Sequence, residues 1–512
     1  MKSISLVGHN IIANFFGGMW TGLVNLIFVS FFIRIIGIEA YGLIGIFTSL
    51  TALFAAFEFG LSSTLSRELS RLSVMKGSDQ ESRDLVRTLE LLYWSIGILI
   101  GIGVILLAPF ITHHWVNPRG IPMDVVKTSI MMMGLCIAFQ WPSSLYSGSL
   151  TGLQRQVLLN AVKIILVTLQ YGGAIFVLWF ISPTILTFFV WQLVMSVIST
   201  VVWAITVWRI LPGYGLHARF SGWLLKKSWR FATGMMGIAA LVTILHQLDK
   251  IILSKMLTLK FFGYYTLAFS IANILIQLVG PIASALFPRF SQLVVKGEEK
   301  FLSSLYHEGC QIVAFIVLPV AATLAFYSKE ILFIWLKNPE TVANSHVLLS
   351  LLVVGTAMNT LVTLPYVLQL AYGFTRLVFL QNLFSVIILI PLMIWMIKQY
   401  GPAGAAIVWV ILNAAYVFIL IPFMHRRFLK SEMWQWYSHD LALPVITIII
   451  VALGLRVFMP VDVTINFLLF WIPVTYLLGL LSLAGVLPLI RKKITTVLVF
   501  IKNTGLLSWS PK

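Results

Sequence analysis

The sequence predicts an all-α polytopic membrane protein with fourteen transmembrane helices, arranged as two six-helix bundles followed by an added helix pair. Hydrophobic residues make up 59% of the chain and charged residues only 10%. Soluble domains are nearer half apolar and a quarter charged. The apolar runs reach the length of about 20 residues that a helix needs to cross a hydrocarbon core. They do not alternate between apolar and polar residues, so a membrane β-barrel is not expected.

The predicted spans follow the apolar runs from one turn signal to the next, as at Pro118 and Pro183. They are residues 10–35, 40–62, 88–111, 127–150, 157–180, 185–208, 231–253, 262–287, 307–328, 346–371, 376–397, 402–424, 441–459 and 464–489. The first pair is expected to form a hairpin with a tight turn through Gly37 and Gly42. The first run is too long for a signal peptide and lacks a cleavage site, so it should remain as a span.

Positive charges predict the orientation of these spans. The formal net charge is +18. With the N-terminus in the cytoplasm, about 24 of the 35 lysines and arginines fall in cytoplasmic segments and about 10 fall outside. Because cytoplasmic loops collect Lys and Arg, this bias predicts that both termini lie inside and that the number of spans is even. The positive net charge is thereby explained by the cytoplasmic loops, and no nucleic-acid partner is expected.

An internal repeat is indicated by like residues at one offset. Three pairs lie 221 residues apart: Gly42 with Gly263, Gly152 with Gly373, and Arg155 with Arg376. An offset of six spans keeps both halves in the same orientation, as in a parallel repeat about an axis along the membrane normal. The predicted division is therefore 1–215 and 216–430 for the two bundles, and 431–512 for the added helices with their basic tail.

Two similar bundles with short loops favour a transporter rather than an enzyme. In a transporter of this kind, a central cleft opens to each side of the membrane in turn. The predicted outside loops at 112–126 and 329–345 are too short to form a large extramembrane active site. The chain has no P-loop, no HExxH motif and no Cys–His cluster, so neither ATP hydrolysis, a metal nor a cofactor is expected. Cys136 and Cys310 fall in apolar spans and are expected to be small core residues.

Ionisable and amide residues inside the spans are the candidate substrate-binding residues, because a charge at mid-membrane costs about 2.5–3.5 kcal/mol. Arg34 ends the first span, and Lys163 lies a turn or two into the fifth. Each could hold an anionic group or snorkel to the headgroups. Lys127, which opens the fourth span, has the same two readings. Asn14 and Asn25 lie three turns apart on one helix face, where their amides could bind a sugar or tie helices together.

Three further residues are candidates for ion coupling. Glu58, near the end of the second span, could act as a cavity acid that carries a proton, or it could be held by Arg67. His246 and Asp249 are three residues apart in the seventh span, hence neighbours on one helix face. They form either a titrating pair coupled to transport or a locally satisfied pair. Transport would then be driven by protons, by sodium or by the membrane potential alone.

Three short motifs carry a family resemblance. They are Arg34-x-x-Gly37-x-Glu39-x-Tyr41-Gly42, Glu58-Phe59-Gly60-Leu61, and Asp249-Lys250-x-x-Leu253 followed by Gly263-Tyr264-Tyr265. Ile36 stands where the family has leucine, and Glu58-Phe59 stand where it has aspartate and leucine. With these motifs the chain resembles the polysaccharide flippases of the multidrug/oligosaccharidyl-lipid/polysaccharide exporter superfamily, and its O-antigen branch most. The likeness covers nearly the whole chain.

The resemblance implies two bundles that rock around a cationic cleft. It implies a bacterial inner-membrane flippase that moves undecaprenyl-diphosphate-linked oligosaccharide from the cytoplasmic to the periplasmic leaflet, for O-antigen, capsule or exopolysaccharide. Arg34 and Lys163 would hold the diphosphate, while Asn and Gln side chains would hold the sugars. Membrane lipids, a polysaccharide polymerase and a chain-length regulator would be its partners.

Three other functions remain open from the sequence. A lipid II flippase of the same superfamily also has fourteen spans. A cation-coupled drug exporter usually has twelve, so the added pair argues against it. A membrane-embedded sugar polymerase or ligase would reveal itself by lengthening glycan chains after purification.

Overall fold

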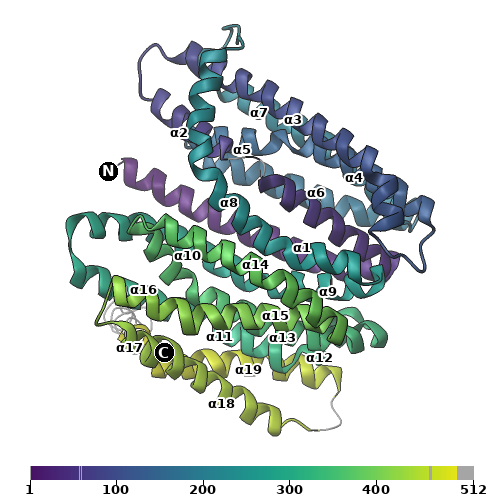
Figure 1. Cartoon of the computed structure of the whole chain (residues 1–512), viewed down its shortest axis with the longest axis vertical. Coiled ribbons are helices and arrows are strands. Elements are labelled where there is room, and N and C mark those ends of the chain that lie inside the picture. The colour runs from purple at the N-terminus through teal and green to yellow at the C-terminus, as the bar shows by residue number, and fades with distance from the viewer. Residues whose placement is uncertain (1, 57, 59, 461–463, 493–512) are drawn as a thin grey trace, which may run out of the picture. The chain divides into compact units, whose positions relative to one another are not determined.

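The computed structural model describes residues 2–56, 58, 60–460 and 464–492 (Figure 1). The regular secondary structure of these residues is helical, apart from one isolated bridge between Asn117 and Thr258. Twelve helices in the described part of the chain are long and apolar enough to cross a membrane. The predicted all-helical membrane class is therefore confirmed.

The helices pack into two compact units. The first unit comprises Met1–Leu267 with Phe379–Ile397, and the second comprises Ala268–Val378 with Lys398–Lys512. The first contains α1 (Lys2–Ala56), α2 (Leu61–Leu72), α3 (Asp79–His114), α4 (Met123–Gln140), α5 (Pro142–Gly152), α6 (Gln156–Phe180), α7 (Ile185–Ile210) and α8 (Gly222–Met256), with the start of α9 (Leu259–Ala272) and most of α14 (Thr375–Tyr400).

The second unit contains α10 (Ile274–Lys296), α11 (Glu299–Phe326), α12 (Ser328–Leu336), α13 (Pro339–Ala371), α15 (Pro402–Ala415), α16 (Ile421–Arg427), α17 (Met433–Gln435), α18 (Leu443–Val457) and α19 (Ile465–Val486). Two π-helices, η1 (Tyr416–Leu420) and η2 (Trp436–Ala442), interrupt its helical runs. The boundaries predicted after residues 215 and 430 separate the two repeats and the added helix pair, whereas these units are defined by packing. The predicted division therefore stays a prediction.

The first two predicted spans are two helices joined at Gly37 within α1. They form the predicted hairpin, because Phe32 packs on Tyr171 of α6 whereas Ala55, later in the chain, lines a pocket with the earlier Lys163. α1 kinks at Gly37, where φ is 83° and ψ is 165°, and then continues as a helix through Gly42. Glycine adopts a positive φ at little cost because it has no Cβ atom. The predicted tight turn through both glycines is thus wrong at Gly42. The helix also ends earlier than predicted, so Glu58 lies in the turn between α1 and α2 and not inside a helix.

Beyond the kink, α1 crosses α9 at a pair of glycines. A Cβ atom added to Gly42 would lie 2.5 Å from the carbonyl oxygen of Leu259, and one added to Gly263 would lie 2.3 Å from that of Ile38. Both distances are far below van der Waals contact, so only glycine fits at either position. Ile38 and Leu259 are themselves 221 residues apart, so the two contacts are counterparts of each other.

Counterpart residues also meet directly in this glycine crossing, which we define as residues 38–45 of α1 and 259–266 of α9. A Cβ atom on Gly45 would lie 2.6 Å from Oγ1 of Thr266, which is 221 residues further along. Reciprocal contacts of this kind arise when two equivalent surfaces meet about a twofold axis. They are the geometry that the predicted parallel repeat requires.

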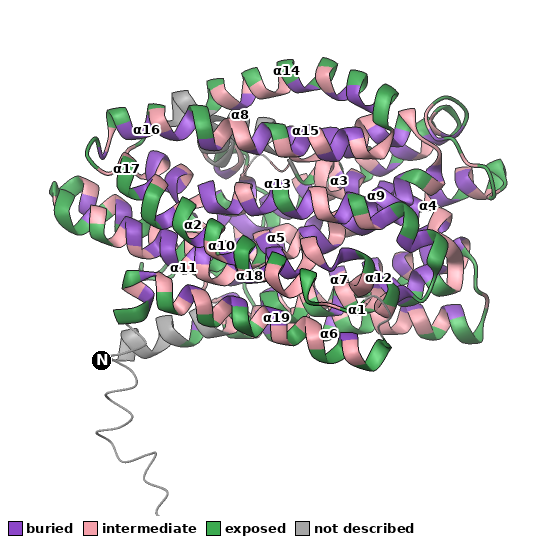
Figure 2. Cartoon of the chain, turned by 90° about the horizontal axis from the view of Figure 1, so that it is seen from below, coloured by how far each residue is buried: buried purple, intermediate pink, exposed green. Residues whose placement is uncertain are grey.

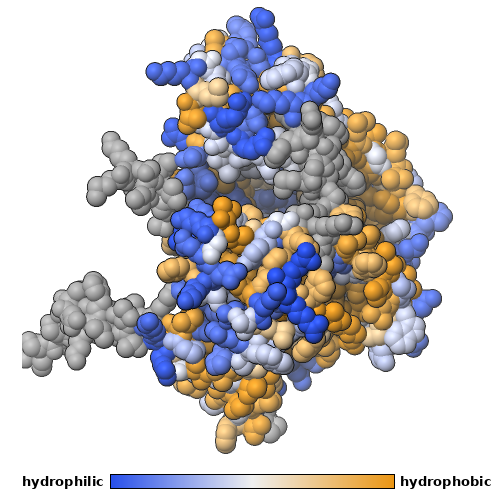
Figure 3. Space-filling model, turned by 60° about the vertical axis from the view of Figure 1, so that its left-hand side comes forward, coloured by the Kyte–Doolittle hydropathy of each residue, from blue (hydrophilic) through white to orange (hydrophobic). Residues whose placement is uncertain are grey.

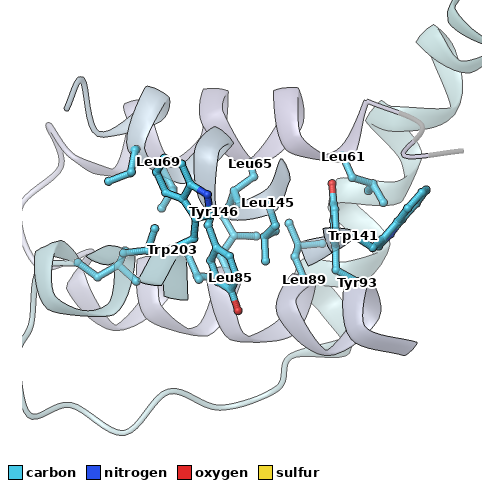
Figure 4. Packing of buried hydrophobic residues seen from close by; sticks show 14 of the residues in the cluster. Leu61, Leu65, Leu69, Leu85, Leu89, Tyr93, Trp141, Leu145, Tyr146 and Trp203 are labelled. Carbon is cyan, nitrogen blue, oxygen red and sulfur yellow. The ribbon is translucent and has the colours of Figure 1, made fainter. Parts of the chain in front are cut away.

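The core of the first unit lies between α2, α3, α5 and α7 (Figure 4). The leucines of α2 recur every four residues and therefore share one face of the helix. Figure 4 shows Leu61, Leu65 and Leu69 directed toward Leu85 and Leu89 of α3. Because these side chains are buried, α2 is held firmly beside the turn that carries Glu58.

Two glycines let α5 approach the backbone of α2. Cβ atoms on Gly148 and Gly152 would lie 2.9 Å from the carbonyl oxygen of Ser62 and 2.5 Å from that of Ser66, respectively. Glycines four residues apart lie on one helix face and allow close contact between helices. The pair therefore fixes the spacing between α2 and α5.

Replacing Gly152 with leucine is expected to destabilise the first unit by about 1–3 kcal/mol, the usual cost of overpacking. The added side chain would push α5 away from α2. The midpoint of thermal unfolding in detergent should fall, whereas it should hardly change for Gly103→Leu, because a Cβ atom at Gly103 meets nothing within 4 Å. Equal midpoints for the two variants would contradict the close packing of α2 and α5.

Many helices carry exposed residues (Figure 2), and large apolar side chains are among them. Leu106 and Phe180 are each 73% exposed, and Ile419 is 71% exposed. Figure 3 shows broad hydrophobic areas on the visible surface. Such a surface suits contact with lipid, and the chain is a multi-pass membrane protein.

Candidate functional site

A polar pocket of about 340 Å³ lies inside the first unit, between α1, α4, α5, α6 and α7. Its polar lining consists of Thr51, Glu58, Gln140, Ser143, Ser144, Lys163, Gln170, Ser196 and Ser199. Trp141 and Trp203 contribute apolar walls. The pocket thus brings together Glu58 and Lys163, which are 105 residues apart in the sequence.

Glu58 is positioned by the turn that follows α1. Its backbone N–H donates to the carbonyl oxygen of Ala55 at 3.2 Å, and Gly60, with φ of 70°, directs the chain into α2. The buried phenol of Tyr93 on α3 donates a hydrogen bond to Oε1 of Glu58 at 2.8 Å. A backbone turn and a hydrogen bond therefore hold the carboxylate at the wall of the pocket.

Lys163 provides the cation of the pocket. It lies on α6 and is half-buried, one and two turns before Leu166 and Gln170, which line the same pocket. The described residues offer its ammonium group no hydrogen bond and no ion pair closer than 4 Å. Since an ammonium group can donate three hydrogen bonds, Lys163 is available to an anionic ligand.

Two amides add neutral polar groups to the pocket. Nε2 of Gln140 donates to Oγ of Ser196 at 2.8 Å, and Nε2 of Gln170 donates to Oε1 of Gln192 at 2.6 Å. These bonds orient both amides. Within the chain as described, their side-chain oxygens accept no hydrogen bond, so they can accept hydrogen bonds from hydroxyl groups of a ligand.

Four of the predicted substrate-binding residues lie outside this pocket. Arg34 and Asn25 are exposed on α1, and Lys127 is half-exposed near the start of α4. Asn14 is exposed, and its amide bridges α1 to α6. Of the five predicted residues, the pocket therefore contains only Lys163.

The bridge from Asn14 has two hydrogen bonds. Its Nδ2 donates to Oε1 of Gln156 at 2.7 Å, and its Oδ1 accepts from Nδ2 of Asn160 at 2.6 Å. Asn160 in turn fills the space beside Gly17, where a Cβ atom would lie 2.1 Å from its Oδ1. The geometry matches the helix-tying alternative for this residue.

The predicted ion-coupling residues fall into two places. Glu58 lines the pocket, whereas Asp249 is buried in a separate cluster of α8 and α9. Oδ2 of Asp249 accepts from the phenol of Tyr265 at 2.6 Å, and Oδ1 lies 3.5 Å from Nζ of Lys250. Nζ of Lys250 also donates to the backbone carbonyl of His246 at 3.0 Å. Tyr265 was present in the Gly-Tyr-Tyr motif, but nothing in that motif indicated that it binds Asp249.

A charged cluster surrounds Glu68 on α2. Its carboxylate lies 2.9 Å from Nη2 of Arg67, 3.2 Å from Nη2 of Arg71 and 3.2 Å from Nζ of Lys227 on α8. Burial alone would raise the pKa of Glu68, but these three cations outweigh burial and lower the pKa below its ordinary value of 4.5. The cluster thus joins α8 to α2.

The lowered pKa of Glu68 predicts how stability depends on pH. Because the folded pKa lies below the unfolded one, the ionised carboxylate stabilises the fold above about pH 4.5, and this contribution is lost as the pH falls through the folded pKa. Glu68→Gln should therefore lower the midpoint of thermal unfolding at pH 7 and approach the unchanged protein in acid. A difference in midpoint that grew toward low pH would contradict the ion pairs.

An apolar pocket of about 970 Å³ lies inside the second unit, between α11, α13, α16, α17, α18 and both π-helices. Val417 and Phe418 of η1 and Tyr437 of η2 line it, and Arg426 is its one charged lining residue. The phenol of Tyr437 donates to the backbone carbonyl of Val417 at 2.5 Å and so connects the π-helices. π-helical turns occur often at functional sites. No sequence pattern indicated this pocket, because pocket-facing and lipid-facing residues are equally apolar.

Comparison with known proteins gives consistent results. The family described as polysaccharide biosynthesis protein matches residues 7–294. A Shigella flexneri protein described as "Putative O-antigen transporter" is 23% identical over 423 residues, which cover 82% of this chain and 97% of that protein.

Two solved structures share the fold. A structure described as lipid II flippase MurJ in an inward closed conformation aligns with a TM-score of 0.68 at 14% identity, covering 95% of this chain and 99% of that one. An inward-facing multidrug resistance transporter of the MATE family, within the MOP superfamily, aligns with a TM-score of 0.61 at 14% identity, covering 83% and 96%.

Proposed function

Because the chain belongs to the polysaccharide biosynthesis protein family, we propose that it is a transporter that flips undecaprenyl-diphosphate-linked oligosaccharide from the cytoplasmic to the periplasmic leaflet. The cargo would serve the synthesis of a surface polysaccharide such as O-antigen, capsule or exopolysaccharide. The observation that carries the proposal is the polar pocket, in which Lys163, with no ion pair among the described residues, lies beside amides and hydroxyls. The O-antigen transporter described for Shigella flexneri supports the same cargo class.

The chemistry of the cargo matches the two pockets, each in its own unit. A diphosphate is anionic and sugars are strongly polar, so crossing a bilayer unaided would cost far too much free energy. Lys163 would pair with a phosphate oxygen, while Gln140 and Gln170 would accept hydrogen bonds from sugar hydroxyls. The apolar pocket of the second unit, with Arg426 in its lining, is a separate site whose lining suits an apolar chain.

Alternating access would work through the glycine crossing. At Gly42 and Gly263 the two equivalent segments approach to backbone distance, and as whole helices they could part and meet again. Fourteen spans are supported by the kink at Gly37, which divides α1 into two runs, and by α8, whose 35 residues are enough to cross a bilayer. We place both termini in the cytoplasm and the protein in the bacterial inner membrane.

Energy coupling and partners follow from the same proposal. Glu58 would exchange a proton or pair with the cargo in the polar pocket, and Asp249 with His246 would form a second coupling site for protons or sodium. The glycan delivered outside would pass to a polysaccharide polymerase and a chain-length regulator.

Reconstitution into vesicles tests the proposal directly. Purified protein should move a fluorescent lipid-linked oligosaccharide between leaflets, and vesicles without protein should not. Movement of lipid II in place of this cargo would favour a second candidate function, that of a lipid II flippase. The similarity of fold to the lipid II flippase structure, over nearly the full length of both chains, is the observation that favours this candidate. Lengthening of glycan chains without any movement would refute a transporter.

A further inference from the structure

A buried cluster in the second unit joins α11 to the segment that follows α16. His307 on α11 lies between two carboxylates. Its Nδ1 contacts Oδ2 of Asp440 on η2, and its Nε2 lies 3.1 Å from Oε2 of Glu432. The side chains of His307 and Asp440 are 3% and 0% exposed, and that of Glu432 is 21% exposed. The cluster is thus largely shielded from solvent.

The two contacts of His307 require one proton more than a neutral imidazole with two ionised carboxylates provides. Each of the two contacts needs one hydrogen between its nitrogen and its oxygen. A neutral imidazole has one N–H, and ionised carboxylates have none. A second hydrogen is therefore required, whether His307 or one carboxyl group carries it.

The remaining bonds of Asp440 keep it in place without this proton. Nε2 of Gln311 donates to Oδ1 of Asp440 at 2.9 Å. Oε1 of Gln311 accepts from the backbone N–H of Leu489, after α19, at 3.1 Å. Asp440 is therefore anchored twice, to α11 by His307 and by Gln311, whereas Glu432 depends on His307 and on Ser431 beside it.

The other titratable groups around His307 have their hydrogen bonds satisfied in neutral form. Nδ1 of His425 on α16 faces the carbonyl oxygen of Ile421 at 3.1 Å, so Nε2 is free to accept from the phenol of Tyr306 at 3.3 Å. Cys310, on α11, is a buried thiol, and Tyr437 on η2 donates to a backbone carbonyl. Of the titratable groups facing it, the trio of His307, Asp440 and Glu432 alone needs the additional proton.

The segment between the two carboxylates forms a wall of the apolar pocket. Met433, Trp434, Tyr437 and Leu441 all line that pocket. Glu432 precedes the first of these residues and Asp440 precedes the last. The trio thus fixes the segment near both of its ends.

We propose that His307, Asp440 and Glu432 form a proton-binding site that fixes the wall of the apolar pocket, and that loss of the proton frees this wall and widens the entry for an apolar chain. Without the proton, one contact places a nitrogen lone pair against a carboxylate oxygen. Glu432 is the contact that breaks, because Gln311 still holds Asp440. The segment 432–442 then moves more freely at its Glu432 end.

Hydrogen–deuterium exchange of the purified protein tests this without any transport assay, so its result is independent of the proposed cargo. After correction for the intrinsic effect of pH, backbone amides of residues 432–442 should exchange about tenfold faster at about pH 9 than at about pH 6, which matches the loss of one charge-assisted hydrogen bond. No difference in the unchanged protein would overturn the proposal, and this comparison needs no variant.

Three variants sharpen the test. His307→Gln should exchange fast at both pH values. Glu432→Gln should exchange slowly at both, because its amide can donate to a neutral imidazole and replaces the missing hydrogen. His439→Gln, an exposed neighbour of Asp440, should keep the original pH dependence. If Glu432→Gln instead kept the full pH dependence, the proton would not belong to this trio.

Discussion

Replacing Gly263 with leucine is expected to reduce transport at least about tenfold while the protein still reaches the membrane. The first atom of any side chain would lie 2.3 Å from the carbonyl oxygen of Ile38, a distance that real Cβ atoms essentially never show. The obstacle is a backbone atom, which cannot rotate away as a flexible side chain can. The glycine crossing could then not close, and the cycle would lack one of its end states. Gly42→Leu should behave in the same way.

Surface polysaccharide in a strain that depends on this protein measures the effect. Gly103→Leu serves as the control, because the space beside Gly103 is open. A second readout follows the crossing itself, with a cysteine introduced at Leu259. This residue is 2% exposed, so a maleimide should react slowly in the parent protein and faster in Gly263→Leu. Normal polysaccharide in both glycine variants would show that transport does not require this contact.

Replacing Lys163 with alanine is expected to lower transport by about ten- to a hundredfold. A charge-assisted hydrogen bond contributes about 1.5–3 kcal/mol, and each 1.4 kcal/mol corresponds to about tenfold. Lys163→Arg should retain part of the activity, because it keeps the charge but changes the geometry. Flipping of fluorescent lipid-linked oligosaccharide in vesicles provides the measurement.

The control for Lys163 is Lys226→Ala, which removes an exposed lysine of α8 outside the pocket and should transport normally. Protein amount in the vesicles is matched for all variants. Transport at the parent rate by Lys163→Ala would mean that the cation of the polar pocket does not bind the cargo. A change of cargo preference without a change of rate would place Lys163 in selection among glycans.

The helical membrane class could be predicted because it depends on composition and on the length of apolar runs, which are local properties of the sequence. A repeat was predicted because Gly42 and Gly263 share one offset with other pairs, but their contact in the crossing of α1 with α9 was not, because an offset gives no distance in space. The kink at Gly37 was predicted as a turn, because a positive φ ends many helices. A second helix begins at once, so the turn does not reach Gly42 as predicted, and the sequence carries no sign of this.

Contacts between distant helices could not be predicted in the same way. Glu58 and Lys163 were candidates separately, yet nothing in their spacing indicated that they share a pocket. His307 and Asp440 are 133 residues apart, and each lies at a predicted span border where a polar residue is unremarkable. Arg34 was a candidate because charge in an apolar run is costly, but its side chain is exposed on α1 and does not line the polar pocket.

The contact between Gly45 and Thr266 carries a consequence for the two segments of the crossing. These residues are counterparts, and in a homodimer of one ancestral copy the same residue would have faced itself. Two threonines would collide at this spacing, and two glycines would leave a hole. Two segments that are encoded separately escape that restriction, because each can mutate alone. A glycine in one segment can then make room for the threonine of the other, which two identical segments could not do.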